Sequence, residues 1–73
     1  MIEIEYVPLD LNRPISTGHY EAKKYGHIIA SALCFNYSPE MHLKSVIKCL
    51  EWVKNHTVDE FVSVNGRTIH MHR

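Results

Sequence analysis

Apolar and polar residues alternate at the start of the chain, as in a strand that buries one face. Ile2, Ile4 and Tyr6 alternate with two glutamates, and the pattern stops near a proline. Successive side chains of a strand point to opposite faces. The segment therefore predicts a short strand over residues 2–7 with its apolar side on a core.

A second alternating pattern lies near the end of the chain, on both sides of Asn65 and Gly66. Asn-Gly tolerates the two positive φ angles of a type I′ turn, whose twist matches that of the flanking strands. This predicts a tight hairpin of strands over 60–64 and 67–72. The expected pairs are Val64 with Arg67, Val62 with Ile69 and Glu60 with Met71, with Val62, Val64, Ile69 and Met71 on the core face.

Between these strands the apolar spacing changes to three and four residues, which is typical of an amphipathic helix. The apolar stripe consists of Leu43, Val46, Ile47, Leu50 and Val53. Ser38 suits the N-cap, Pro39 the first helical position and Glu40 the positive end of the helix dipole. We expect a helix over 39–55 that buries this stripe.

Two interpretations stay open for residues 19–35. A helix would place Ala22, Tyr25, Ile29, Ala32 and Leu33 on one side, and good helix formers at residues 21–24 favour it slightly. The alternative is a strand over 27–37, for which Gly26 would supply a bend. Residues 8–18, rich in proline and small polar residues, predict a long loop.

These elements predict an α+β fold in a single domain over 1–73. A small antiparallel sheet, formed by the strand at 2–7 and the C-terminal β-hairpin, packs on the amphipathic helix over 39–55. Residues 19–35, as helix or strand, complete the core.

Composition narrows the function classes. The chain has 73 residues and a formal net charge of zero, so the basic footprint of a phosphate-binding protein is absent. No apolar run approaches the roughly 20 residues that span a bilayer, and the acidic start is unlike a signal peptide. We expect a cytoplasmic protein that does not bind membranes, with Cys34 and Cys49 as reduced thiols.

Candidate chemistry is sparse. The sequence contains no catalytic motif such as GxSxG, HExxH or a P-loop, so we expect no catalytic residues, no cofactor and no enzymatic activity. Among six histidines, His70 and His72 are two apart on a predicted strand and would face the same way, as a ligand pair requires. No third ligand has a recognisable spacing, so we expect exposed histidines and no metal site.

The strongest binding signal is Trp52, the only tryptophan. At about 100° per residue it lies opposite the apolar stripe, grouped with Met41, Ser45 and Lys48 and close to Lys44. Trp and Met are enriched where proteins bind partners, so this helix face is a candidate partner-binding surface. The alternative is that a neighbouring loop, residues 8–18, covers Trp52 within the chain.

If residues 19–35 form a helix, the element order resembles the helix-turn-helix and wing of winged-helix domains. That resemblance implies nucleic-acid contacts by Lys44 and Lys48 on the second helix and by Arg67 at the hairpin tip. The low charge makes nucleic acid the less favoured partner.

In size, cytosolic character and layout the chain is similar to small phage-encoded regulators that bind host RNA polymerase and block initiation or promote antitermination. The resemblance includes no motif, so it transfers no functional residue. It implies a host protein complex such as RNA polymerase as partner and steric or competitive displacement as mechanism. Anti-CRISPR and other anti-defence inhibitors share the profile, and the chain would act as a monomer or a homodimer.

Overall fold

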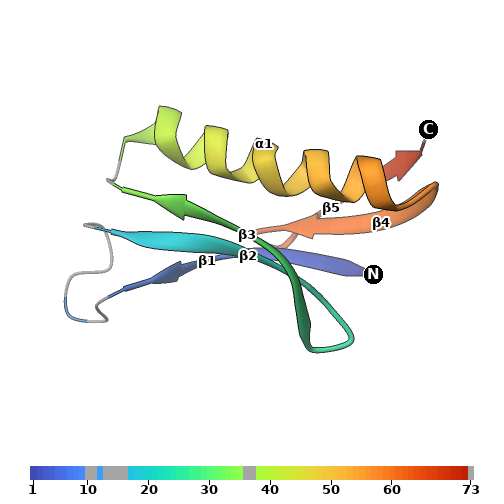
Figure 1. Cartoon of the computed structure of the whole chain (residues 1–73), viewed down its shortest axis with the longest axis horizontal. Coiled ribbons are helices and arrows are strands. Elements are labelled where there is room, and N and C mark those ends of the chain that lie inside the picture. Colours follow the sequence, from blue (N-terminus) through green and yellow to red (C-terminus); the bar gives the residue numbers. More distant parts are fainter. Residues whose placement is uncertain (10–11, 13–16, 36–37, 73) are drawn as a thin grey trace.

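The described residues form five strands and one helix. The structure, a computed structural model, describes residues 1–9, 12, 17–35 and 38–72. Its elements are β1 (Ile2–Pro8), β2 (Gly18–Lys24), β3 (His27–Cys34), α1 (Pro39–His56), β4 (Asp59–Val64) and β5 (Arg67–His72). All five strands belong to one sheet, and α1 lies across one of its faces (Figure 1). The predicted α+β class is confirmed.

The sheet has the strand order β3-β2-β1-β4-β5, so the first strand of the chain is the central one. Neighbouring strands of the sheet pair antiparallel, with one exception. Strands β1 and β4 are parallel, with Ile2 opposite Val62 and Ile4 opposite Val64. The parallel pair makes the sheet mixed, whereas the sequence predicted an antiparallel one. The reason is α1, which carries the chain back along the sheet so that β4 runs in the same direction as β1.

The helical interpretation of residues 19–35 is wrong, because this segment forms β2 and β3. The strand alternative over 27–37 agrees with β3 over most of its length. Tyr25 and Gly26 have φ angles of 53° and 80°, close to the 49° and 89° of Asn65 and Gly66. Both hairpins therefore turn through two positive φ angles. Helix-forming residues in β2 are overridden because β1 and β3 pair with it on both sides.

The C-terminal hairpin and the helix bounds are confirmed. Val64 pairs with Arg67, Val62 with Ile69 and Glu60 with Met71. The helix starts at Pro39 as expected, although the Ser38 side chain makes no capping hydrogen bond. It ends at His56. Thr57 then adopts an extended conformation, and its N–H donates to the Val53 carbonyl at 2.9 Å.

The core lies between α1 and the face of the sheet that we call the core face; the opposite face is the outer face. The buried residues are Ile2, Ile4, Tyr20, Ala22, Ala32, Cys34, Cys49, Val53 and Val62, together with Ser45. Both cysteines are free thiols, and burial raises the pKa of Cys49. The loop expected over 8–18 falls mainly on residues outside those described.

The predicted apolar stripe is confirmed in part: Val53 is in the core and Val46 and Leu50 pack against it, but the other two residues do not. Leu43 and Ile47, expected in the core, are 60% and 42% exposed, whereas Ser45, Cys49 and Val53 are buried. The cause is a close approach of α1 to the sheet. The Ser45 hydroxyl donates to the carbonyl of Leu33 in β3 at 2.7 Å, and Cys49 Sγ lies 4.0 Å from the carbonyl of Tyr20 in β2. Only small side chains fit at such a contact.

The helix phase can be tested with a matched pair of truncations. Val53→Ala removes two buried methyl groups and should lower the free energy of unfolding by about 2 kcal/mol. Leu43→Ala removes a larger but exposed side chain and should change it by less than about 0.5 kcal/mol. Urea unfolding followed by circular dichroism measures both. A larger loss for Leu43→Ala would contradict this phase.

Candidate protein-binding surface

The helix covers only part of the core face. It lies closest to β3 and β2, and its C-terminal end borders a cavity that β5 also lines. The β4–β5 hairpin presents four apolar side chains on this face, Val62, Val64, Ile69 and Met71. Val62 is fully buried, Val64 and Met71 are half-buried against the core, and Ile69 is 38% exposed. The exposed part of this face is therefore on the edge strand β5, at Ile69.

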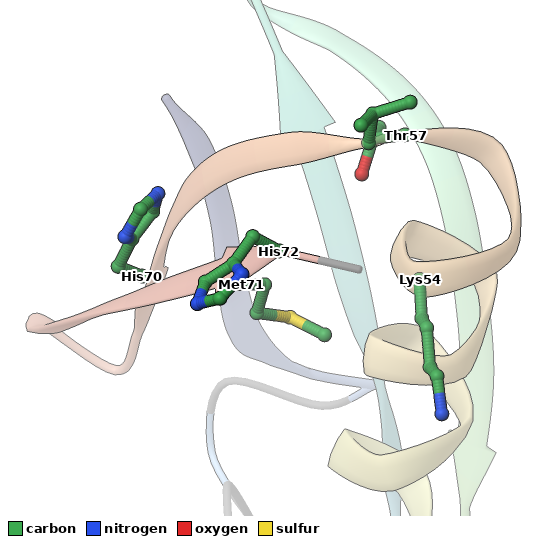
Figure 2. Close-up of a pocket in the computed structure, with 6 residues that line it drawn as sticks. Lys54, Thr57, His70, Met71 and His72 are labelled. Atoms are coloured by element: carbon green, nitrogen blue, oxygen red, sulfur yellow. The ribbon is translucent and has the colours of Figure 1, made fainter.

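One side of α1 adds to this apolar area. Leu43, Ile47, Leu50 and Lys54 are spaced by four, three and four residues, so they lie along one line of the helix. Lys54 lines a cavity of about 250 Å³ together with Thr57, Val58, His70, Met71 and His72 (Figure 2). Lys54 and Met71 line the same cavity, so the C-terminal end of α1 lies next to β5.

We call the combined area the open apolar surface. It consists of Leu43, Ile47 and Leu50 from α1, Val58 from the connection to β4, and Val64, Ile69 and Met71 from the hairpin. Val58 is 69% exposed, and Leu43 and Ile47 are also well exposed. Single exposed apolar residues are ordinary, but apolar side chains gathered from several elements mark a binding surface.

Charged side chains border the open apolar surface. Glu51 lies one helical turn after Ile47. Arg67 pairs with Val64 across the hairpin and shares the core face with it. Both side chains are exposed. Within the described ranges, neither Glu51 nor Arg67 makes an ion pair or a hydrogen bond through its side chain. The border therefore carries one acidic and one basic group that are available to a partner.

Beside Met71, Glu60 belongs to an ion-pair network. Lys24 Nζ donates to Glu60 Oε2 at 2.8 Å, and the amino group of Met1 lies 3.6 Å from Glu60 Oε1. The Lys24 hydrogen bond holds the pKa of the Glu60 carboxyl below its ordinary value of 4.5, and burial opposes this shift. The network connects β2 to β4 across the start of β1.

At the start of α1, Tyr6, Tyr20 and His42 form an aromatic cluster that the sequence did not indicate. Tyr20 Oη and His42 Nδ1 are hydrogen-bonded at 2.8 Å, and the Tyr6 ring lies 5.0 Å from the His42 ring. Burial, with Cys34 and Tyr20 nearby, raises the pKa of Tyr6. Tyr6 therefore stays protonated at neutral pH, and the cluster fixes the first turn of α1 on the sheet.

The predicted partner face on α1 is largely turned toward the sheet. Ser45 is 1% exposed, and Met41 and Trp52 are half-buried against the core. The Trp52 ring also stacks on His56 at 4.0 Å. Only Lys44 and Lys48 are exposed. The expectation of a solvent-facing Trp52 is wrong because the close approach at Ser45 rotates this side of the helix inward.

His70 and His72 lie on the same face of β5, as the predicted hairpin requires. His70 and His72 share the outer face, with ring centroids 5.3 Å apart, and His70 hydrogen-bonds Asp59 and stacks on Phe61. Among the residues that the structure describes, no group of three or more His, Cys, Asp or Glu side chains is placed to hold a metal ion.

The basis of the winged-helix resemblance is absent, because residues 19–35 supply strands instead of the first helix of that motif. Arg67 lies at the start of β5 and Lys44 and Lys48 on exposed positions of α1, but the helix pair that would present them to a groove of DNA is missing.

Comparison with known protein families, with curated proteins and with solved structures gives no match for this chain. In the part of the chain that the structure describes, no helix combines the length and apolar character needed to cross a membrane.

Trp52→Ala should act on stability. Removing a half-buried indole that packs on the core should lower the free energy of unfolding by about 1–3 kcal/mol. Lys48→Ala, one turn earlier on the exposed side, is the control and should change it by less than about 0.5 kcal/mol. If urea unfolding gave Trp52→Ala the same stability as wild type, Trp52 would not be a core residue and would again be a candidate for partner binding.

Stability should also depend on pH through Glu60. Because its folded-state pKa is lowered, its contribution is present above the ordinary pKa and is lost as pH falls through the lowered one. Glu60→Gln should therefore be less stable than wild type at neutral pH and lose less between about pH 5 and pH 2. The control is Glu5→Gln, an exposed carboxylate on the outer face. If the free energy of unfolding changed with pH by the same amount in wild type and in Glu60→Gln, the stabilising role assigned to the Glu60 carboxylate would be wrong.

Proposed function

We propose that the chain is a small non-enzymatic protein-binding module that docks on a larger partner through its open apolar surface. The observation that carries this proposal is the exposure of large apolar side chains on successive elements. Leu43 and Ile47 on α1 are 60% and 42% exposed, Val58 in the connection to β4 is 69% exposed, and Ile69 on β5 is 38% exposed. Apolar side chains at the centre with charged groups at the border are the usual anatomy of a protein interface.

The charges favour a protein over nucleic acid as the partner. The chain has equal numbers of basic and acidic residues, and Glu51 borders the open apolar surface on the helix side. A phosphate backbone would meet this carboxylate and few cations, which is unfavourable for binding. An apolar ridge or amphipathic helix of a protein would bury Leu43 and Ile47 instead.

As the first candidate partner we propose a host machine such as RNA polymerase, on the basis of the similarity in size and layout to phage-encoded regulators. The proposed setting is the host cytoplasm. The mechanism would be steric or competitive displacement on the polymerase surface, causing inhibition or antitermination, and the chain would perform no chemistry. Anti-CRISPR and other anti-defence inhibition are the alternatives of the same protein-binding class.

The test uses purified bacterial RNA polymerase, as core and as holoenzyme, with binding followed by biolayer interferometry and activity by transcription in vitro. Ile47→Lys places a charge in the centre of the open apolar surface and should weaken binding at least about tenfold, which is 1.4 kcal/mol. The matched control is Ile28→Lys, because Ile28 is 57% exposed on the outer face.

Binding that survives Ile47→Lys but is lost in Ile28→Lys would move the site to the outer face. Absence of binding to both polymerase forms would reject RNA polymerase. The same pair of variants would then be compared in affinity capture from nuclease-treated bacterial lysate, where a protein held by wild type and Ile28→Lys but lost with Ile47→Lys identifies the partner. If neither experiment shows such a protein, the proposed function is wrong.

A further inference from the structure

We propose that the edge strand β5 binds an extended peptide segment in which apolar and acidic side chains alternate. The segment would add to the sheet as a further strand, with apolar side chains beside Ile69 and Met71. This inference deepens the proposed function and rests on it, because it gives the chemistry of the partner segment that docks at the hairpin.

The backbone of β5 has one side without a partner strand. Among the described strands, β5 pairs with β4 alone. The N–H of Asn65 donates to the Ile4 carbonyl of β1 at 2.9 Å. Since backbone direction alternates along a strand, the even-numbered residues of β4 point toward β5, where they pair with residues 67, 69 and 71. The N–H and C=O groups of Thr68, His70 and His72 therefore point away from β4, and we call this side of β5 its open edge.

Of the two edge strands, β5 is the better suited to accept another strand. Strand β3 shifts register against β2 between Ala22 and Lys23, and such an irregularity bends a strand and interrupts its pairing. In contrast, β5 pairs with β4 in one register over all six of its residues. It has no proline or lysine to protect its edge, and its one arginine, Arg67, lies beside the turn.

A cavity lies at the open edge, between β5 and the end of α1. His70 and His72 point to the outer face and Met71 to the core face, yet all three line this cavity. A cavity lined from both faces of one strand lies at the edge of that strand. Its volume is about 250 Å³. One water needs only about 10–15 Å³, so the cavity has room for a side chain of a partner. Its lining residues are Lys54, Thr57, Val58, His70, Met71 and His72 (Figure 2).

The core-face side of the edge favours apolar side chains in the segment. Neighbouring strands lie about 4.8 Å apart, so every second side chain of an added strand would lie on the core face beside Ile69 and Met71. Ile69 is 38% exposed there, and Val58, at the same cavity, is 69% exposed. An added strand would cover both of these apolar side chains.

The charges at the cavity favour acidic side chains at the other positions of the segment. Lys54 supplies an ammonium group and His70 and His72 supply imidazoles, whereas none of the described lining residues is acidic. The carboxylate of Asp59, which lies opposite His72, is already hydrogen-bonded to His70. A carboxylate of the segment would therefore meet basic groups at this edge.

The probe for this site is a fluorescently labelled synthetic peptide of alternating valine and glutamate, as long as β5 and capped at both ends. Fluorescence anisotropy should show saturable binding to the whole chain. The controls are a peptide of the same composition with all valines before the glutamates, and a peptide of alternating valine and lysine. Each control should bind at least about tenfold more weakly. Equal binding of the alternating and the block peptide would overturn the inference.

Methylation of the peptide backbone tests strand addition without changing the protein. Only one edge of an added strand faces β5, so N-methyl groups on all valines or on all glutamates block opposite edges. One methylated peptide should lose binding at least about tenfold and the other should keep it. Loss with methylated glutamates identifies antiparallel addition and loss with methylated valines identifies parallel addition, and either supports the inference. Equal binding of the two overturns it.

A matched pair of protein variants tests the position of the site. Lys54→Glu adds a carboxylate to the cavity lining, so it should weaken binding of the valine–glutamate peptide at least about fivefold and strengthen binding of the valine–lysine peptide. Lys48→Glu makes the same charge change at an exposed helix position outside the cavity lining and should leave both affinities unchanged. Circular dichroism confirms that both variants are folded. Equal effects of the two variants would overturn the assignment to this cavity.

The two proposals fail separately. RNA polymerase binding that depends on Ile47, with no binding of the valine–glutamate peptide, leaves the proposed function intact and removes strand addition at β5. Peptide binding that Lys54→Glu weakens, with no protein captured from polymerase or lysate, keeps the site at β5 and removes the proposed partner.

Discussion

The close approach of α1 to β2 and β3 determines the arrangement of everything else in this protein. Ser45 reaches the Leu33 carbonyl, and Cys49 lies against the Tyr20 backbone. Small side chains at these two positions fix which side of the helix faces the sheet. The same contact directs Trp52 and Met41 toward the core and leaves Leu43 and Ile47 exposed. It also holds the helix nearest β2 and β3, so Ile69 on the edge strand β5 stays exposed although Val62 on β4 is buried.

Local signals in the sequence were sufficient for the strand at Ile2–Pro8, the helix at Pro39–His56 and the hairpin, including its register. Each depends on residues close together in the chain: alternation, a proline start, and an Asn-Gly turn. The β2–β3 hairpin was missed because its turn is Tyr25-Gly26, where a tyrosine occupies a positive φ that asparagine usually occupies. The parallel pairing of β1 with β4 was missed because no local pattern encodes the direction of a distant neighbour.

For the candidate site, the prediction from the sequence was wrong for a different reason. Its two exposed helical residues, Leu43 and Ile47, were identified as apolar positions but were assigned to the core, because they belong to the more hydrophobic stripe. Helix α1 has two apolar sides, and the sheet selects the one with the smaller residues, Ser45 and Cys49, since packing depends on fit as well as on hydrophobicity. A line of small residues at four-residue spacing, continued by Val53, was the available signal. The surface left over by this choice is the basis of the proposed binding function.

The central position of β1 has a consequence for how the chain is made. Residues 1–34 can pair as a local three-stranded meander as soon as they leave the ribosome, since β1, β2 and β3 are neighbours in the chain and in the sheet. One edge of β1 must wait until β4 has been synthesised, more than fifty residues later. Until then an apolar strand with unpaired backbone groups is accessible to other nascent chains. The sheet is therefore complete only when β4 pairs with β1, and until then β1 presents an apolar strand with one open edge.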